Sequence, residues 1–247
     1  MQKDQDIMRD LLSKKKNFVF IGEAGSGKSE LAINFALKMG EVAEKPVHLF
    51  DMDQTKPLFR SRDVTDLMEE EGIVVHSQKQ LLDAPTLVPG VVESLTDPET
   101  YVLLDIGGNA TGARMVGQFS QLLNDEDTHV FFVINTYRPW SKDAMNINET
   151  LYSISRVSRI KHVNIISNPN LGIETTAEDV VIGNNKLKDI IDGSVPIDYV
   201  CCLSELYDEV KDKVEEPLIP VDIFIVYPWY LRNPGKLFPE GPRGTWK

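Results

Sequence analysis

The sequence predicts a three-layer α/β fold, in which helices cover both faces of a mostly parallel central sheet of about seven strands. Short apolar segments, many of them rich in Val, Ile and Phe, alternate with helical patterns along the 247 residues. Several of these segments are apolar throughout, as is typical of strands that are covered on both faces. We therefore expect a series of βαβ units in one large domain.

Each expected strand is a short apolar run that ends at polar or glycine residues. In chain order the strands are residues 17–22, 47–51, 73–76, 101–106, 129–135, 162–167 and 195–200. The helices before and between them repeat apolar residues at helical spacing. They are residues 1–15, 28–40, 62–71, 84–95, 113–123, 142–155, 177–191 and 203–214.

Two parts of the chain differ in composition. Residues 1–216 carry the alternating pattern and open with an amphipathic helix, so we expect them to form the main domain. Residues 217–247 contain a strand-like run at 221–226, followed by a tail that is rich in Pro, Gly and aromatic residues. Two interpretations of this tail stay open: it packs over its own domain, or its aromatic side chains anchor a partner.

The charge balance argues against a broad surface for nucleic acid or anionic lipid. The chain has 26 basic and 38 acidic residues, which gives a formal charge of −12. We expect a cytoplasmic protein with no membrane span, because no apolar stretch is long enough and the first residues lack the apolar core of a secretory signal. The adjacent Cys201 and Cys202 do not suggest a disulfide framework. We expect buried thiols there, because metal sites favour cysteines that are spaced apart.

Residues 22–29, with the sequence GEAGSGKS, match the phosphate-binding pattern G-x-x-x-x-G-K-[ST], and they lie between an apolar strand and a helix. Glycines let the backbone fold around phosphates, and the start of a helix adds its dipole to the anion site. Lys28 is expected to reach the β- and γ-phosphates, and the Ser29 hydroxyl to bind Mg²⁺. The residues predicted to contact the nucleotide are Gly22, Ala24, Gly25, Ser26, Gly27, Lys28, Ser29 and Glu30.

Acidic residues at two strand ends complete this predicted site. The segment YVLLDIGGN ends a strand with Asp105, which is expected to hold Mg²⁺ directly or through water, and it places Gly108 close to a γ-phosphate. The segment HLFDMD ends another strand with Asp51 and Asp53. One of these two carboxylates is expected to orient the attacking water or to contact the ligands of the metal. The predicted catalytic residues are therefore Lys28, Asp51 and Asp53.

Together these motifs resemble the MinD/ParA/CobQ-type P-loop NTPases of the SIMIBI class. The resemblance spans residues 15–215 and rests on the phosphate loop, FDMD, LLDIGG, IISNPN and VPID in the family's order. It implies ATP or ADP with Mg²⁺ as ligands, a protein partner and, as one common assembly, a homodimer. By position, Asp51 resembles the aspartate that polarises the water, Asp105 the aspartate on the metal side, and Asn168 an asparagine at the adenine edge. Residues 195–198 resemble the loop that closes over the base.

Glu23, the second residue of the loop, departs from this family. Dimeric members typically have a lysine there that reaches the partner's phosphates, whereas a carboxylate is repelled by a triphosphate unless it is turned away or paired. The signature lysine is thus missing, and neither lysine-mediated activation nor fast hydrolysis is carried over. Four arginines could replace the missing lysine, although a surface or salt-bridged role is the alternative for each of them: Arg60, Arg62, Arg114 and Arg138.

The predicted base is adenine, because the N-K-x-D motif by which P-loop GTPases bind guanine is missing from the sequence. Three functions stay open. In the main hypothesis the protein is an ATP-dependent switch or slow Mg-ATPase that acts on an unidentified protein partner. Alternatively it is a small-molecule kinase or ligase of the dethiobiotin-synthetase type, or it senses ATP and ADP without turnover. No insertion is long enough to suggest the lid that a kinase would add.

Overall fold

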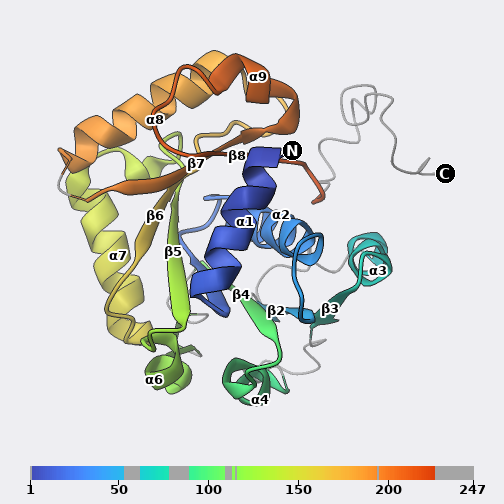
Figure 1. Cartoon of the computed structure of the whole chain (residues 1–247). Coiled ribbons are helices and arrows are strands. Elements are labelled where there is room, and N and C mark those ends of the chain that lie inside the picture. Colours follow the sequence, from blue (N-terminus) through green and yellow to red (C-terminus); the bar gives the residue numbers. More distant parts are fainter. Residues whose placement is uncertain are drawn as a thin grey trace.

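In the computed structural model, helices cover both faces of a single twisted sheet (Figure 1). The structure describes residues 2–52, 62–77, 89–108, 113–114, 116–193 and 195–225. Both the phosphate loop and the ends of the neighbouring strands lie within these residues. Asp53 and the tail from residue 226 onward lie outside them, so the predictions made for them stay predictions.

The described residues form an eight-stranded sheet. Its strands are β1 (Asn17–Ile21), β2 (Val47–Met52), β3 (Ile73–His76), β4 (Tyr101–Ile106), β5 (Thr128–Ile134), β6 (Asn164–Ser167), β7 (Ile197–Leu203) and β8 (Leu218–Val221). Their order across the sheet is β3-β2-β4-β1-β5-β6-β7-β8, and all neighbouring pairs are parallel. The predicted α/β class with a parallel sheet is therefore confirmed.

The helices of the described residues alternate with these strands. They are α1 (Gln2–Lys14), α2 (Lys28–Gly40), α3 (Arg62–Glu70), α4 (Val91–Thr96), α6 (Ser120–Leu123), α7 (Ala144–Ser158), α8 (Ala177–Ile191) and α9 (Tyr207–Val210), with 3-10 turns η2 (Gly117–Phe119), η3 (Pro139–Ser141) and η4 (Ser204–Leu206).

Several of the predicted helices have different bounds in the structure. The helix expected at 142–155 is Ala144–Ser158, and the one expected at 113–123 ends in the turn η2 and the short helix α6. The helix expected at 84–95 begins at Val91 in the described part, after Gly90 in the left-handed region with φ 85°. The helix expected at 203–214 is reduced to η4 and α9, because Leu203 still belongs to strand β7.

Side chains alternate between the two faces of the sheet, and each face has its own helices. Phe18 and Phe20 of β1 belong to an apolar cluster with α1, α2 and α3, whereas Val19 and Ile21 belong to a cluster with α4, α6 and α7. Since both faces are buried, the strands are apolar at consecutive positions, as their sequences predicted. A smaller cluster joins α8 and α9 to β7 and β8.

Strand β8 lies earlier in the chain than the run predicted at 221–226. It pairs with β7 through Leu218–Val221 and forms one edge of the sheet, where the missing amide of Pro220 is tolerated. Beyond Val221 the backbone no longer pairs with β7. Residues 222–225 instead turn onto helix α2, whose side chains hydrogen-bond their backbone. The prediction of strand over this segment was therefore wrong, because side chains of α2 compete for the same amides.

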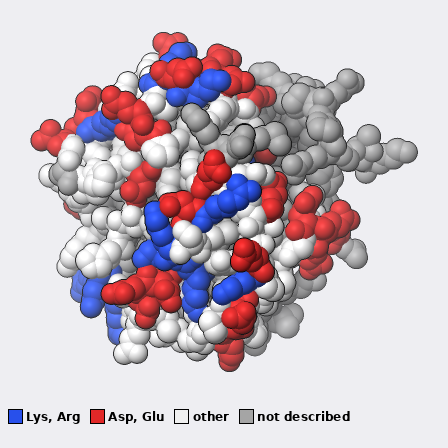
Figure 2. Space-filling view, in the orientation of Figure 1, with Lys and Arg blue, Asp and Glu red and all other residues white. Residues whose placement is uncertain are grey.

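Helix α1 covers the face on which α2 lies. Met8 and Leu11 are buried there, and Nζ of Lys38 donates to Oδ2 of Asp4 at 3.0 Å. Figure 2 shows the surface on this side, where acidic and basic side chains are interspersed and no continuous basic patch is visible. None of the described helices has the length and apolar character needed to cross a membrane.

Candidate functional site

The phosphate loop lies at the carboxyl edge of the sheet, between the central strand β1 and the first turn of α2. Gly25 and Gly27 give the loop its path, with φ angles of 79° and 93° in the left-handed region. A Cβ atom at Gly27 would lie 2.3 Å from Nδ2 of Asn168. Glycine is required at position 27 for both reasons, which explains the spacing of the motif.

Side chains from the neighbouring loops hold the carbonyl groups of the phosphate loop. Nδ2 of Asn168, after β6, donates to the Ser26 carbonyl at 2.8 Å, and Nε of Arg138, after β5, donates to the Gly25 carbonyl at 3.0 Å. The carbonyl and the amide of one peptide point in opposite directions. A Ser26 carbonyl that faces Asn168 therefore turns the Gly27 amide to the opposite side, as an anion site requires.

Asn168 thus has a place that the sequence analysis did not assign to it. Its amide was expected at the edge of an adenine base, whereas the structure places the Nδ2 group beneath the phosphate loop. The side chain is almost fully buried. Contact between Asn168 and a base stays a prediction, and bracing of the loop is its observed role.

Glu23 turns its carboxylate back onto the loop itself. Its Oε1 accepts a hydrogen bond from the Ala24 amide at 2.8 Å, and its carbonyl accepts one from the Ser26 amide at 3.1 Å. The sequence analysis required this side chain to be turned away or paired. The hydrogen bond from the Ala24 amide meets the second of these two conditions.

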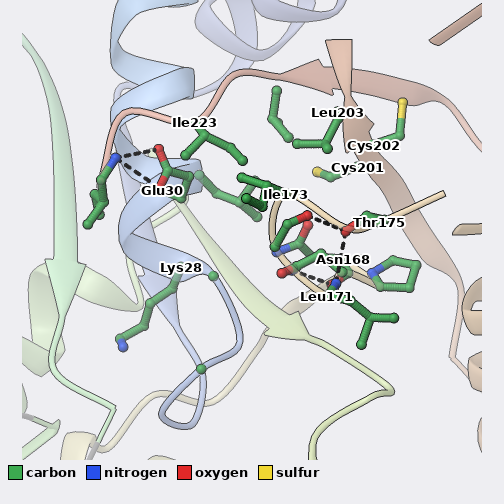
Figure 3. A pocket seen from close by; sticks show the side chains of 18 of the residues that line it. Lys28, Glu30, Asn168, Leu171, Ile173, Thr175, Cys201, Cys202, Leu203 and Ile223 are labelled. Atoms are coloured by element: carbon green, nitrogen blue, oxygen red, sulfur yellow. Dashed lines mark hydrogen bonds between the residues drawn. The ribbon is translucent and has the colours of Figure 1, made fainter. Parts of the chain in front are cut away.

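The first residues of α2 carry the predicted phosphate and metal contacts. Lys28 is 1% exposed, and Ser29 is half-buried. The Leu31 amide donates to the Gly27 carbonyl at 3.0 Å, so the hydrogen bonding of the helix begins at the loop. The positive end of the helix dipole therefore lies at the loop. In Figure 3, Lys28 extends away from the apolar side chains of the neighbouring pocket.

Two predicted carboxylates meet beside this helix. Asp51 ends β2 and Asp105 lies near the end of β4, and the two residues are register partners on adjacent strands. Asp105 also pairs in register with Phe20, whose side chain belongs to the α2 face, so both carboxylates lie on that face. They are 8% and 0% exposed. The structure therefore brings together the two acids that the sequence placed at separate strand ends.

Gly108 brings the loop after β4 into contact with the phosphate loop. A Cβ atom at this position would lie 2.8 Å from the Ala24 amide nitrogen and 2.9 Å from the Gly22 carbonyl oxygen. Backbone atoms cannot move aside as the end of a side chain can, so no larger residue fits. The structure thus places Gly108 against the phosphate loop, and its approach to a γ-phosphate stays a prediction.

A cavity of about 760 Å³ opens on the other side of the loop, toward β6, β7 and β8. Its floor is the loop and the start of α2, including Gly27, Lys28 and Ser29. Its lining also includes the apolar side chains of Leu171, Ile173, Leu203 and Ile223, which Figure 3 labels. The volume lies within the range of small-ligand sites, which is about 300–1,000 Å³. The phosphate loop and apolar side chains therefore border the same cavity.

The sequence analysis missed two parts of this arrangement. Arg138 was considered as a substitute for the missing lysine, but not as a brace of the loop. Asn135, directly after β5, donates from Nδ2 to the Asn170 carbonyl at 2.9 Å and so ties the β5 and β6 loops together. A polar residue directly after an apolar strand was the available signal. Glu30 was predicted to contact the nucleotide, whereas in the structure its carboxylate accepts from the backbone of the segment after β8, which nothing in the sequence indicated.

Three further predictions concern residues away from the phosphate loop. Cys201 and Cys202 are buried on opposite faces of β7, as expected, and burial raises both thiol pKa values, that of Cys202 to about 12. Within the described ranges no cluster of three or more His, Cys, Asp or Glu side chains is arranged to hold a metal ion.

Residues 195–198 were predicted to close over the base. They lie at the amino end of β7, at the opposite edge of the sheet from the phosphate loop, so they do not close over that site.

No protein-family model and no curated protein matches this sequence. Solved structures do. The chain is similar to chloroplast FtsY from Physcomitrella patens, with 13% identity and a TM-score of 0.51, over 79% of this chain and 65% of that one. FtsY from Thermotoga maritima gives 16% identity and a TM-score of 0.48, over 79% and 68% of the two chains. FlhF complexed with GTP and Mg²⁺ gives 16% identity and a TM-score of 0.44, over 78% of this chain and 71% of that one.

What these proteins share with the chain is the fold. At this identity the likeness bears on the fold alone, so the SIMIBI class that the sequence resembles stays a prediction. The MinD/ParA branch of that class stays a prediction. The chain spans about two thirds of the length of the FtsY structures, at 65% and 68%.

Proposed function

We propose that this protein binds a nucleoside triphosphate with Mg²⁺ at residues 22–29 and acts as a nucleotide-dependent switch, with slow hydrolysis, on a protein partner. The observation that carries the proposal is the braced loop. Asn168 and Arg138 hold the carbonyl groups of Ser26 and Gly25 at 2.8 Å and 3.0 Å, and the first of these contacts turns the Gly27 amide away from Asn168. An anion is the ligand that such a loop and helix terminus favour.

The residues beside the loop suit a magnesium ion. Mg²⁺ prefers oxygen ligands and keeps several waters, and the hydroxyl of Ser29 and the carboxylate of Asp105 are donors of that kind. Asp51, the register partner of Asp105, would orient the attacking water. When bound, the metal would neutralise charge on the phosphates. Slow turnover is part of the proposal because Glu23, paired with its own loop, supplies no positive charge.

We propose ATP as the nucleotide. In the guanine motif N-K-x-D, an acid stands three residues after the asparagine. Here that position after Asn168 is Leu171, which lines the cavity with an apolar side chain. An adenine ring needs no carboxylate partner, and its faces suit an apolar wall.

Melting temperatures with and without nucleotide test this proposal. At a ligand concentration of about 100 times Kd, binding adds about 2.7 kcal/mol to the free energy of unfolding. For a chain of this size that is roughly 5–10 °C. We expect Mg-ATP to raise the melting temperature of the wild type but not of Lys28→Ala, with the exposed Lys142→Ala as the matched control that keeps the effect.

Two results would contradict parts of the proposal separately. If neither ATP nor GTP raises the melting temperature, the site does not bind nucleotides. If GTP displaces bound ATP at equal concentration, the assignment of the base is wrong while the phosphate site stands. Phosphate release from Mg-ATP that rises only when a small metabolite is added would support a kinase or ligase instead of a switch.

A further inference from the structure

The backbone that follows β8 forms one wall of the cavity beside the phosphate loop. We call residues 222–225 the strap. Asp222, Ile223 and Ile225 line the cavity, together with Val221 at the end of β8. The strap therefore borders the same cavity as Lys28 and Ser29, although it lies far from them in the sequence.

Two side chains of α2 hold the strap by its backbone. Oδ1 of Asn34 accepts from the Asp222 amide and Nδ2 of Asn34 donates to the Asp222 carbonyl, both at 2.8 Å. Oε1 of Glu30 accepts from the Phe224 amide at 2.5 Å, and Oε2 accepts from the Ile225 amide at 3.2 Å. Glu30 and Asn34 are four positions apart, so they lie one above the other on the same side of the helix.

These hydrogen bonds connect the strap to the phosphate loop through one rigid element. Glu30 directly follows Ser29 in the first turn of α2, and Nδ2 of Asn34 also donates to the Glu30 carbonyl at 2.9 Å. The helix start that faces the phosphates therefore also fixes the position of the strap. Figure 3 shows the bonds from Glu30 to the strap beside Ile223, with Ile173 on another wall of the pocket.

The hydrogen bonds of Glu30 support a positioning role. Its side chain is half-buried beside the strap. A carboxylate that is partly removed from water is tolerated where its acceptors are used. Its acceptors are used by the strap, because both oxygens bind strap amides.

We propose that the strap is the wall of the nucleoside subsite, and that Glu30 and Asn34 are positioning residues that set the affinity for the nucleoside without contributing to the affinity for the phosphates. This inference rests on the proposed function, and it specifies where the base and sugar bind. The apolar side chains of Ile223 and Ile173 suit the faces of an aromatic base. Loss of the α2 contacts would free the strap and open this wall.

A comparison of two ligands tests the inference. ATP occupies both ends of the cavity, whereas inorganic tripolyphosphate occupies the phosphate end alone. We expect Glu30→Ala and Asn34→Ala each to weaken Mg-ATP binding about tenfold, since each leaves backbone groups of the strap without their partners. Binding of Mg-tripolyphosphate is expected to stay within about twofold of the wild-type value, because the loop is unchanged. Titration calorimetry measures both ligands on the same preparations.

Two additional variants keep the test decisive. Glu41→Ala changes the same residue type at the exposed end of α2 and is expected to bind both ligands as the wild type does. Ile223→Ala keeps the hydrogen bonds of the strap and shortens its wall, so it is expected to weaken ATP but not tripolyphosphate even if the other variants fold poorly. Circular dichroism of each variant identifies any that fail to fold.

The outcomes separate the inference from the proposed function. If the wild type binds both ligands and the strap variants weaken both equally, or weaken neither, the strap is not a nucleoside wall and the inference is overturned alone. If the wild type binds neither ligand, the proposed function is overturned and the inference with it. A selective loss of ATP affinity in the strap variants and in Ile223→Ala supports the inference.

Discussion

Asp51 and Asp105 are register partners on the adjacent strands β2 and β4, and both carboxylates lie on the face of the sheet that helix α2 covers. Two buried acids at the carboxyl ends of neighbouring strands, beside a helix that begins with a lysine and a serine, form the metal side of the proposed site. The strands on the other side of the phosphate loop form the cavity. The phosphate loop at the end of β1 therefore lies between the two carboxylates on one side and the cavity on the other.

Removing the charge of Asp105 is expected to affect Mg²⁺ binding, whereas removing that of Asp51 is expected to affect hydrolysis. Asp105→Asn is expected to lower the affinity of the nucleotide-bound site for Mg²⁺ by about 10- to 100-fold, because a carboxamide is a poorer ligand for that ion. Asp51→Asn is expected to lower the hydrolysis rate by about 100-fold with little change in affinity. Binding of a fluorescent nucleotide is measured against Mg²⁺ concentration, and phosphate release separately. Equal effects of both variants on Mg²⁺ affinity would refute this division of roles.

Gly108→Ala is expected to destabilise the protein by about 1–3 kcal/mol and to weaken nucleotide binding. The added methyl group would lie 2.8 Å from the Ala24 nitrogen, so the phosphate loop or the β4 loop must shift. Gly40→Ala is the control: its methyl group would lie 2.7 Å from Cδ1 of Ile73, the movable end of a side chain far from the site. A Gly108→Ala protein with unchanged nucleotide affinity would show that the two loops move independently.

Glu23→Lys is expected to tighten nucleotide binding about tenfold at low salt and less at high salt. The substitution replaces a carboxylate at the phosphate loop by an ammonium group, and it removes the acceptor of the Ala24 amide. Glu44→Lys makes the same change of charge at an exposed position after α2 and serves as the control. The nucleotide dissociation constants of both variants are measured at two salt concentrations. An equal gain in affinity in Glu44→Lys would mean that the net charge of the protein, and not the position of residue 23, causes the effect.

His129 is expected to make stability depend on pH. Burial, with a smaller contribution from Lys15, lowers its pKa from 6.5 to about 4. Between these values the unfolded chain binds more protons than the folded protein, so the stability that this residue contributes is lost as the pH falls through that window. His129→Phe keeps an aromatic ring beside Phe131 and cannot be protonated.

The measurement is the difference in melting temperature between His129→Phe and the wild type at several pH values. We expect the variant to lose less stability than the wild type on acidification from pH 6.5 to 4, with each kcal/mol appearing as roughly 2–4 °C. A difference that stays constant over this range would show that His129 has the same pKa in the folded and unfolded states.

Much of the fold could be predicted because it depends on local patterns. The bounds of β3 and β4, of α2 and of α8 agree with those read from the apolar spacing. The phosphate motif was equally local, since glycine, lysine and serine act within one turn. The prediction failed for β8 and for the helix after β7, where side chains distant in sequence compete for the backbone or where a strand extends further. Local propensity contains no information about such competitors.

The sequence by itself determined the phosphate loop, the succession of strands and helices along the chain, and the departure at Glu23, because each depends on residues that are neighbours in the chain. Only the tertiary structure decided that Asp51 and Asp105 are register partners, that Asn168 braces the phosphate loop, and that Glu30 holds the strap. These relationships depend on strand order and register. They arise when the sheet forms, since parallel strands bring their carboxyl ends to one edge however far apart they lie in the sequence.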